Sequence, residues 1–167
     1  SVEHLVVVPF AASKPALDGV RNATLWSEWL ASAPASVPPF ARLPFDHPVY
    51  ILYSSGTTGL PKCIVHGAGG TLLQHFKEHA LHTDIRAGDR VFYFTTCGWM
   101  MWNWLASVLG LGATILLYDG APMPPANPAA LWDLAAGEKL TAFGTSARYL
   151  ALAEKEGIAP ARTHDLG

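Results

Sequence analysis

A short run of small, hydroxyl-bearing and basic residues constrains this chain most: Tyr53-Ser54-Ser55-Gly56-Thr57-Thr58-Gly59-Leu60-Pro61-Lys62. It follows an apolar segment, residues 48–52, whose pattern is typical of a strand. Glycine allows backbone conformations closed to other residues, and successive N–H groups in such a turn form a concave anion site. The hydroxyl groups add hydrogen-bond donors, and Lys62 adds a charge suited to phosphate. The run therefore predicts a polyphosphate-binding loop between two strands.

The spacing within this run excludes two common phosphate-binding motifs. The nucleoside-triphosphatase loop reads GxxxxGK[ST], but Pro61 stands five positions after Gly56, and Cys63 follows Lys62. The dinucleotide motif GxGxxG also fails, because Gly56 and Gly59 are three positions apart. A plain hairpin loop is the alternative, and a lysine between two flanking strands argues against it.

The run resembles the phosphate-binding signature of the adenylate-forming superfamily, which includes the acyl- and aryl-CoA synthetases. That signature reads Tyr/Phe-Thr/Ser-Ser-Gly-Thr/Ser-Thr-Gly-x-Pro-Lys, and this chain matches it throughout. The resemblance extends over residues 50–67, 73–75 and 94–104. It implies a two-step reaction. A carboxylate attacks the α-phosphorus of Mg²⁺-bound ATP and pyrophosphate leaves; the acyl-adenylate then reacts with the thiol of CoA and releases AMP.

The resemblance also implies roles for particular residues. It implies that the residues that bind the polyphosphate are Ser54, Ser55, Gly56, Thr57, Thr58, Gly59 and Lys62. It also implies that Trp99, Met100 and Met101 form the wall of the acyl pocket. Thr145 and Ser146 are implied to lie near the adenylate. For the Trp and Met cluster, core packing is the alternative. The implied acid is a short β-keto acid, with acetoacetate favoured. Acetate and propionate are the alternatives, although their enzymes carry smaller residues after the tryptophan.

Several family elements do not appear in this chain: the later adenylate motif, the ribose-binding aspartate, the hinge, and the small domain with the catalytic lysine. We therefore expect a piece of an N-terminal AMP-binding domain, inactive alone, with the rest of the parent chain as its partner. We assign no catalytic residue and no metal ligand to it. A non-catalytic α/β module that binds a nucleotide or a protein is the alternative from another functional class.

Two regions differ in pattern. Residues 1–45 combine a short strand at 5–8 with a proline-rich irregular segment, whereas residues 46–167 hold the phosphate loop followed by alternating strands and helices. This alternation predicts an α/β fold with a mostly parallel sheet covered by helices. Ligands gather at the carboxyl ends of such strands, and three motifs follow strands: 54–62, 96–103 and 144–146.

A helix expected at about residues 71–82 carries three histidines. We expect its buried stripe to consist of Leu72, Leu73, Phe76 and Ala80, with His75, His79 and His82 flanking it. His75 and His79 are four positions apart, a spacing that can hold a metal ion. A polar helix edge and a face bordering a cleft are the alternatives.

Charge and apolar patterning exclude other classes. The formal net charge is −2, so no basic stripe predicts nucleic-acid binding. Residues 91–118 carry no charge, but their pattern predicts a strand, a helix (99–109) buried on most faces, and a strand instead of a membrane span. No signal peptide is evident. Cys63 and Cys97 show no metal or redox spacing, so we expect small buried thiols in a cytoplasmic protein.

Overall fold

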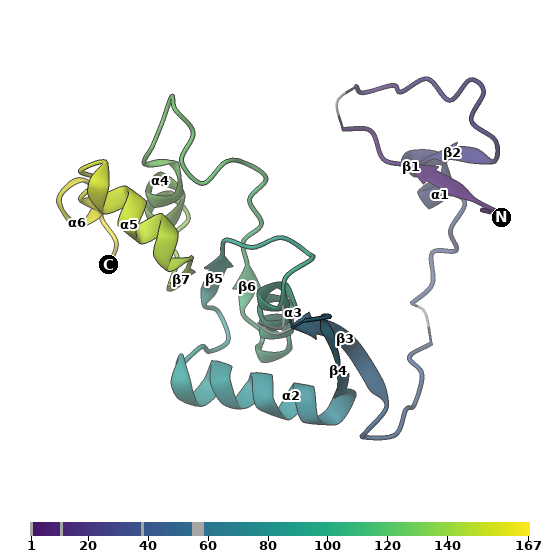
Figure 1. Ribbon diagram of the computed structural model, residues 1–167, viewed down its shortest axis with the longest axis horizontal. Helices are drawn as coiled ribbons and strands as arrows, with labels where there is room; N and C mark the ends of the chain where they lie inside the picture. Colours follow the sequence, from purple (N-terminus) through teal and green to yellow (C-terminus); the bar gives the residue numbers. More distant parts are fainter. Residues whose placement is uncertain (1, 11, 38, 55–58) are drawn as a thin grey trace. The chain divides into compact units, whose positions relative to one another are not determined.

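The structure is a computed structural model that describes residues 2–10, 12–37, 39–54 and 59–167 (Figure 1). The chain divides into two compact units, Ser1–Arg42 and Leu43–Gly167. In the first unit, β1 (Leu5–Val7) pairs in parallel with β2 (Ala23–Leu25), and α1 (Trp26–Ala31) follows directly. The rings of Trp26 and Trp29 contact each other, with centroids 5.4 Å apart. Both rings are partly exposed, and α1 contributes no fully buried residue.

The second unit contains two sheets. An antiparallel hairpin joins β3 (Pro48–Ser54) to β4 (Lys62–Gly67), and a parallel sheet has the order β6-β5-β7. The three parallel strands are β5 (Arg90–Tyr93), β6 (Thr114–Ile115) and β7 (Ala142–Gly144). The expected α/β architecture is thus confirmed. The hairpin is antiparallel because a connection as short as 55–61 can only reverse the chain, whereas parallel neighbours need a longer crossover.

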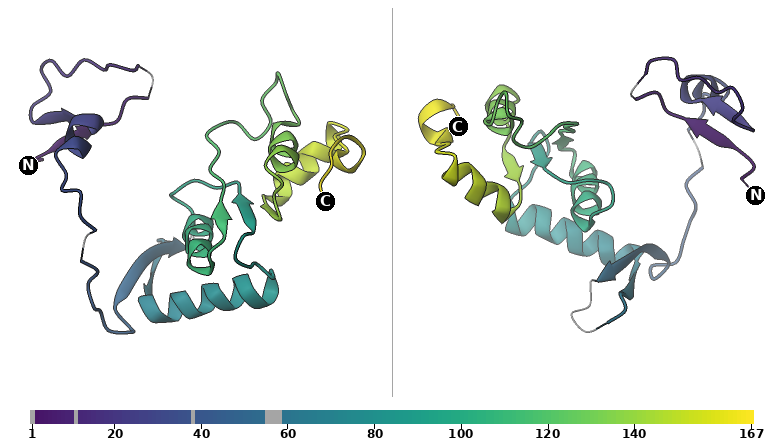
Figure 2. Two further views of the ribbon diagram at one scale, coloured as in Figure 1. Left: turned by 180° about the vertical axis from the view of Figure 1, so that it is seen from behind. Right: turned by 45° about the horizontal axis from the view of Figure 1, so that its top comes forward.

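Helices form the crossovers of this unit and cover both faces of the parallel sheet (Figures 1 and 2). Val91 and Phe92 are consecutive in β5, so their side chains point to opposite faces. Val91 packs with Leu105 and Val108 in one core cluster, and Phe92 packs with Leu131 and Tyr149 in the other. The helical segments are α2 (Ala68–Lys77), which continues as the π-helix η1 (Glu78–His82), α3 (Met100–Ser107), which continues as the 3₁₀ turn η2 (Val108–Leu111), α4 (Ala130–Gly137), α5 (Ala147–Lys155) and α6 (Pro160–Thr163).

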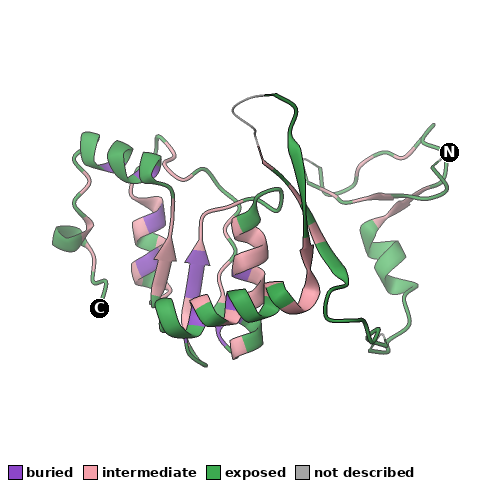
Figure 3. Cartoon of the chain, turned by 60° about the horizontal axis from the view of Figure 1, so that its bottom comes forward, coloured by how far each residue is buried: buried purple, intermediate pink, exposed green. Residues whose placement is uncertain are grey.

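Burial is concentrated on the central strand and on the inward sides of the helices (Figure 3). The uncharged stretch 91–118 forms β5, α3 with η2, and β6, as expected. Across the described ranges, no helix has the length and apolar character needed to cross a membrane. The expectation that residues 99–109 are buried on most faces holds only in part. Leu105 and Val108 are buried and most of the remaining residues are half-buried, whereas Trp99, Met100 and Leu109 are exposed.

The two cysteines also differ from expectation. Cys63 and Cys97 are both free and exposed. Cys63 lies in the hairpin, one residue after the start of β4, and Cys97 lies in the loop between β5 and α3. Neither position contributes to the two core clusters, so the prediction of buried thiols is wrong.

Candidate functional site

The β3–β4 hairpin carries the predicted phosphate loop at its tip. Ser54 and Lys62 are paired across the two strands, so the chain leaves β3 and enters β4 at the same level. Lys62 is exposed. Gly59 has φ +151°, a conformation that residues with a side chain rarely adopt. The other predicted phosphate contacts, Ser55, Gly56, Thr57 and Thr58, lie outside the described residues.

The helix after the hairpin presents an unexpected face to the protein. Leu72, Leu73 and Ala80 are exposed, whereas His75 is 9% exposed and His79 is fully buried. The predicted apolar stripe is therefore wrong except for the half-buried Phe76. The reason is that α2 packs against α3 with its histidine side, where a polar group of α3 is available to both rings.

That polar group is the Ser107 hydroxyl. It lies 3.0 Å from His75 Nδ1 and 2.8 Å from His79 Nε2, and it donates to the Trp104 carbonyl oxygen at 2.7 Å. A hydroxyl has one proton to donate and two lone pairs to accept with. Since the proton goes to Trp104, both imidazoles donate. The hydrogen-bond pattern therefore assigns the proton to Nδ1 of His75 and to Nε2 of His79.

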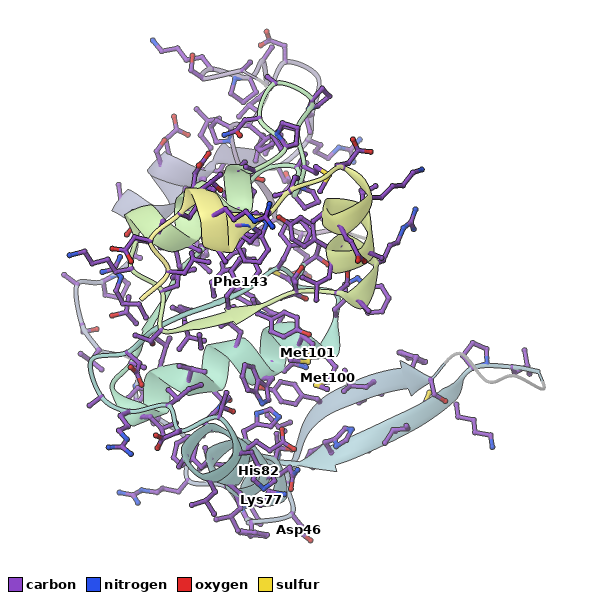
Figure 4. All side chains as sticks on the ribbon, turned by 90° about the vertical axis from the view of Figure 1, so that its left-hand side faces the viewer. Asp46, Lys77, His82, Met100, Met101 and Phe143 are labelled. Atoms are coloured by element: carbon purple, nitrogen blue, oxygen red, sulfur yellow. The ribbon has the colours of Figure 1, made fainter. Side chains whose placement is uncertain are left out.

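Burial keeps these two imidazoles neutral. Desolvation lowers the pKa of His75 below its ordinary value of 6.5, and Glu78 and His66 act on it more weakly, in opposite directions. Desolvation also lowers the pKa of His79, followed by repulsion from His75. The alternative of a metal site receives no support: the described residues contain no group of three or more metal-ligating side chains. His82 is exposed, and Figure 4 labels it on the same helical segment. Within the described part of the chain, it forms no hydrogen bond with Ser107, unlike His75 and His79.

A cavity of about 400 Å³ lies between the hairpin, α2 and the start of α3. Its volume is in the range of small-molecule sites. Thr71 is one of its lining residues, and the Thr71 hydroxyl is buried without a hydrogen-bond partner among the described residues. The lining residues are Tyr50, Leu52, Val65, His66 and Gly67 from the hairpin, Gly70, Thr71, Gln74, His75 and Glu78 from α2 and η1, and Met100, Asn103 and Trp104 from α3.

The predicted acyl-pocket residues are not equally placed. Met100 lines the cavity and lies beside the hairpin (Figure 4). Met101 is half-buried, and Trp99 is 70% exposed at the N-terminal end of α3, outside the cavity lining. Met100 and the hairpin therefore line the same cavity, whereas Trp99 does not line it.

Two of the three motifs expected at strand ends meet at one edge of the sheet. Tyr93 pairs with Gly144, and Phe94 N donates to the Gly144 carbonyl at 2.8 Å, so residues 96 and 145 follow neighbouring parallel strands. The Ser146 side chain caps α5 by accepting from Tyr149 N at 3.2 Å. The Thr145 hydroxyl is buried without a partner among the described residues. The third motif, residues 54–62, belongs to the β3–β4 hairpin, which is a separate sheet.

Sequence reasoning missed Thr71, Gln74 and Asn103 as members of one cavity. The missed signal was helical spacing: Met100, Asn103 and Trp104 stand at i, i+3 and i+4, and so share one face of α3. In α2, Thr71, Gln74 and His75 have the same i, i+3 and i+4 spacing, so they also share one face of their helix.

Comparison with known proteins decides the family. The model of the family described as AMP-binding enzyme matches residues 4–167. The chain belongs to the AMP-binding enzyme family. Among AMP-binding enzymes, it is 57% identical over 162 residues to acetoacetyl-coenzyme A synthetase of Rhizobium meliloti (strain 1021), covering 96% of this chain and 25% of that protein.

Two further relatives cover different shares of the chain. Malonamoyl-CoA synthetase vrtB of Penicillium aethiopicum is 52% identical over 130 residues, covering 72% of this chain and 18% of that protein. The solved acetoacetyl-CoA synthetase from Streptomyces lividans superposes with a TM-score of 0.81 at 44% identity, covering 98% of this chain and 24% of that one. This chain thus spans about a quarter of the length of the acetoacetyl-CoA synthetases that it matches.

Proposed function

We propose that this chain supplies the phosphate-binding hairpin and one part of the acyl pocket of an AMP-forming acid–CoA ligase. The enzyme activates a short acid with a carbonyl group at the β-position, acetoacetate first among them, as its acyl-adenylate, and transfers the acyl group to CoA. The observation that carries the proposal is that the two strands joined by the predicted phosphate-binding run also line the cavity beside Met100.

The hairpin addresses the main physical obstacle of the first step, which is to bring a carboxylate against a polyphosphate. The loop and Lys62 offset the charge of the β- and γ-phosphates and hold the leaving pyrophosphate in line. In this proposal the contacts come from Ser54, Ser55, Gly56, Thr57, Thr58, Gly59 and Lys62. Preorganised donors of this kind need no rearrangement during the reaction.

Mg²⁺ has no assigned ligand in this chain. The described residues hold no cluster of three or more His, Cys, Asp or Glu side chains. In the proposed enzyme Mg²⁺ accompanies ATP, and we derive no step of the reaction through it.

The acid is proposed from the cavity and from the names of the relatives. The acyl groups of acetoacetyl-CoA and malonamoyl-CoA both carry a carbonyl group at the β-carbon, and those names belong to relatives at 57% and 52% identity. Met100 lines the cavity directly, and we assign Trp99 and Met101 to the mouth and the outer wall of the pocket. Acetate and propionate, the smaller candidates, would leave more of the cavity empty.

Thr145 and Ser146 are proposed neighbours of the adenylate. Of the two, Thr145 is the better candidate, because its buried hydroxyl has no partner among the described residues, whereas Ser146 is used as a helix cap. Two exposed free thiols suit a reducing compartment, and we place the enzyme in the cytoplasm.

The test uses the full-length protein that contains this segment. We expect acid-dependent exchange of pyrophosphate into ATP with acetoacetate, and we expect none from residues 1–167 alone. Lys62→Ala should lower kcat/KM by about 10²-fold, because it removes a charge that stabilises the transition state. Lys155→Ala, on the last turn of α5, is the matched control and should retain activity.

Two outcomes would contradict this proposal. The first is a full-length protein that exchanges pyrophosphate with no short acid, which would favour a binding module without catalysis. The second is an equal loss of activity in the Lys62 and Lys155 variants.

A further inference from the structure

The cavity beside the hairpin has a polar part that an alkyl chain would leave without partners. Thr71 lines this cavity, and its hydroxyl is buried without a hydrogen bond to any described residue. The Asn103 amide lines the same cavity from α3, one helical turn after Met100. Burying such groups unpaired costs free energy, so a ligand that completes their hydrogen bonds is favoured over one that does not.

Two other polar residues of the cavity, Glu78 and His75, offer no donor to a carbonyl oxygen; Tyr50 and His66 line the cavity as well. Gln74 Nε2 donates to Glu78 Oε1 at 2.6 Å, and Trp104 Nε1 donates to Glu78 Oε2 at 3.2 Å. His75 carries its proton on Nδ1 for Ser107, so its Nε2 can only accept. A carbonyl oxygen needs a donor, and the engaged carboxylate and His75 Nε2 offer none.

We propose that Thr71 and Asn103 determine acid specificity by donating hydrogen bonds to the β-carbonyl oxygen of the acyl group, an inference that rests on the proposed function. Met100, with Leu52 and Val65 of the hairpin, provides apolar surface for the carbon chain. The substrate class is therefore short acids with a hydrogen-bond acceptor on the β-carbon. Malonamate fits this class as well as acetoacetate, whereas butyrate has the same chain length and lacks the oxygen.

The physical basis for discrimination is the penalty for an unpaired site. A pocket discriminates weakly between two substrates that differ only by a methylene group. A pocket built to hydrogen-bond a substrate oxygen rejects the analogue without it far more strongly, because its own donors then stay buried and unpaired. Removing the donors should therefore reduce selectivity in two ways: activity toward the β-carbonyl acid falls, and the penalty against the acid without the oxygen is relieved.

The experiment measures kcat/KM of the full-length enzyme for acetoacetate and for butyrate, in wild type, Asn103→Leu and Thr71→Val. These substitutions keep the approximate size and remove the donor. We expect the wild type to prefer acetoacetate, and each variant to lose about 10²-fold of the acetoacetate-to-butyrate ratio with butyrate activity retained or raised. Malonamate should fall in parallel with acetoacetate. Thr114→Val, an exposed position in β6, is the matched control and should keep the wild-type ratio.

The possible results separate this inference from the proposed function. Wild-type enzyme that activates neither acid contradicts the proposed function. Wild-type enzyme that prefers acetoacetate, with an unchanged ratio in Thr71→Val and Asn103→Leu, contradicts only the assignment of these two residues, as does a loss of the ratio in Tyr50→Phe alone. An equal fall for both acids shows a structural role and overturns the inference too. If Asn103→Leu does not fold, Thr71→Val decides.

Discussion

At the residue scale, Gly144 shows how closely the strand edge beside the predicted adenylate contacts is packed. It ends β7, and a Cβ atom built on it would overlap the ring of Tyr93 in the neighbouring strand. The ring cannot move freely, because Tyr93 packs on the core and against Trp104. Glycine is therefore required here for close approach of two strands.

Gly144→Ala should destabilise the protein by about 1–3 kcal/mol, the usual cost of overpacking. The measurement is the midpoint of denaturant unfolding. Gly137→Ala is the matched control, because a Cβ atom there would meet nothing within 4 Å at the end of α4. Equal midpoints for the two variants would show that the Tyr93 ring yields to the added methyl group.

At the element scale, the contact between α2 and α3 depends on two neutral histidines. His79 is fully buried, and its ring meets the Trp104 ring edge-on at 4.3 Å between centroids. His75 and His79 both bond Ser107. A proton added to either imidazole would bring charge into this contact beside a second imidazole, and burial is the main reason that the pKa of each is lowered.

The stability of this helix pair should fall as the pH is lowered below about 6.5. In that range the unfolded chain binds protons at His75 and His79, whereas the folded chain does not, because the folded pKa of each imidazole is lowered. Stability is thus complete above the unfolded pKa and decreases as the pH falls toward the folded pKa. Thermal unfolding between about pH 8 and about pH 5 measures it.

The matched comparison is between His79→Gln and His82→Gln. The first removes a buried imidazole and should weaken the pH dependence of the melting temperature; the second removes an exposed one and should leave it nearly unchanged. A melting temperature that is flat from pH 8 to 5 in the unmodified protein would contradict the neutral, buried assignment.

At the scale of the whole molecule, the chain contains two compact units with a boundary between Arg42 and Leu43. Both residues are exposed and lie outside helices and strands. Backbone of this kind is accessible to proteases, whereas backbone within a sheet is protected.

Brief trypsin treatment should therefore cut first after Arg42 and release a product that begins at Leu43. Arg90 is the internal comparison: it lies in β5 and forms an ion pair with Glu138, so cleavage after it should be slow. Mass spectrometry identifies the products, and circular dichroism should find helix and strand retained in residues 43–167. Early cleavage after Arg90 would contradict the prediction that the core sheet protects its backbone from trypsin.

Comparison of expectation and structure shows what short-range pattern can predict. The strands at β3, β5 and β6 were predicted correctly, as was the helix between the last two. These features depend on consecutive residues, so local composition predicts them. The roles of the loop residues themselves remain predictions, since residues 55–58 lie outside the described part of the chain.

The amino-acid sequence alone determined the alternation of strands and helices, and hence the fold class. Only the tertiary structure decided which side of α2 faces inward, because periodicity identifies a face but not its partner. Leu72 and Leu73 formed the more apolar face, yet Ser107, far along the chain, provides the contact that brings His75 and His79 inside. Similarly, Thr71 and Asn103 share a cavity because α2 packs against α3. Such contacts depend on long-range packing, which no local window of sequence contains.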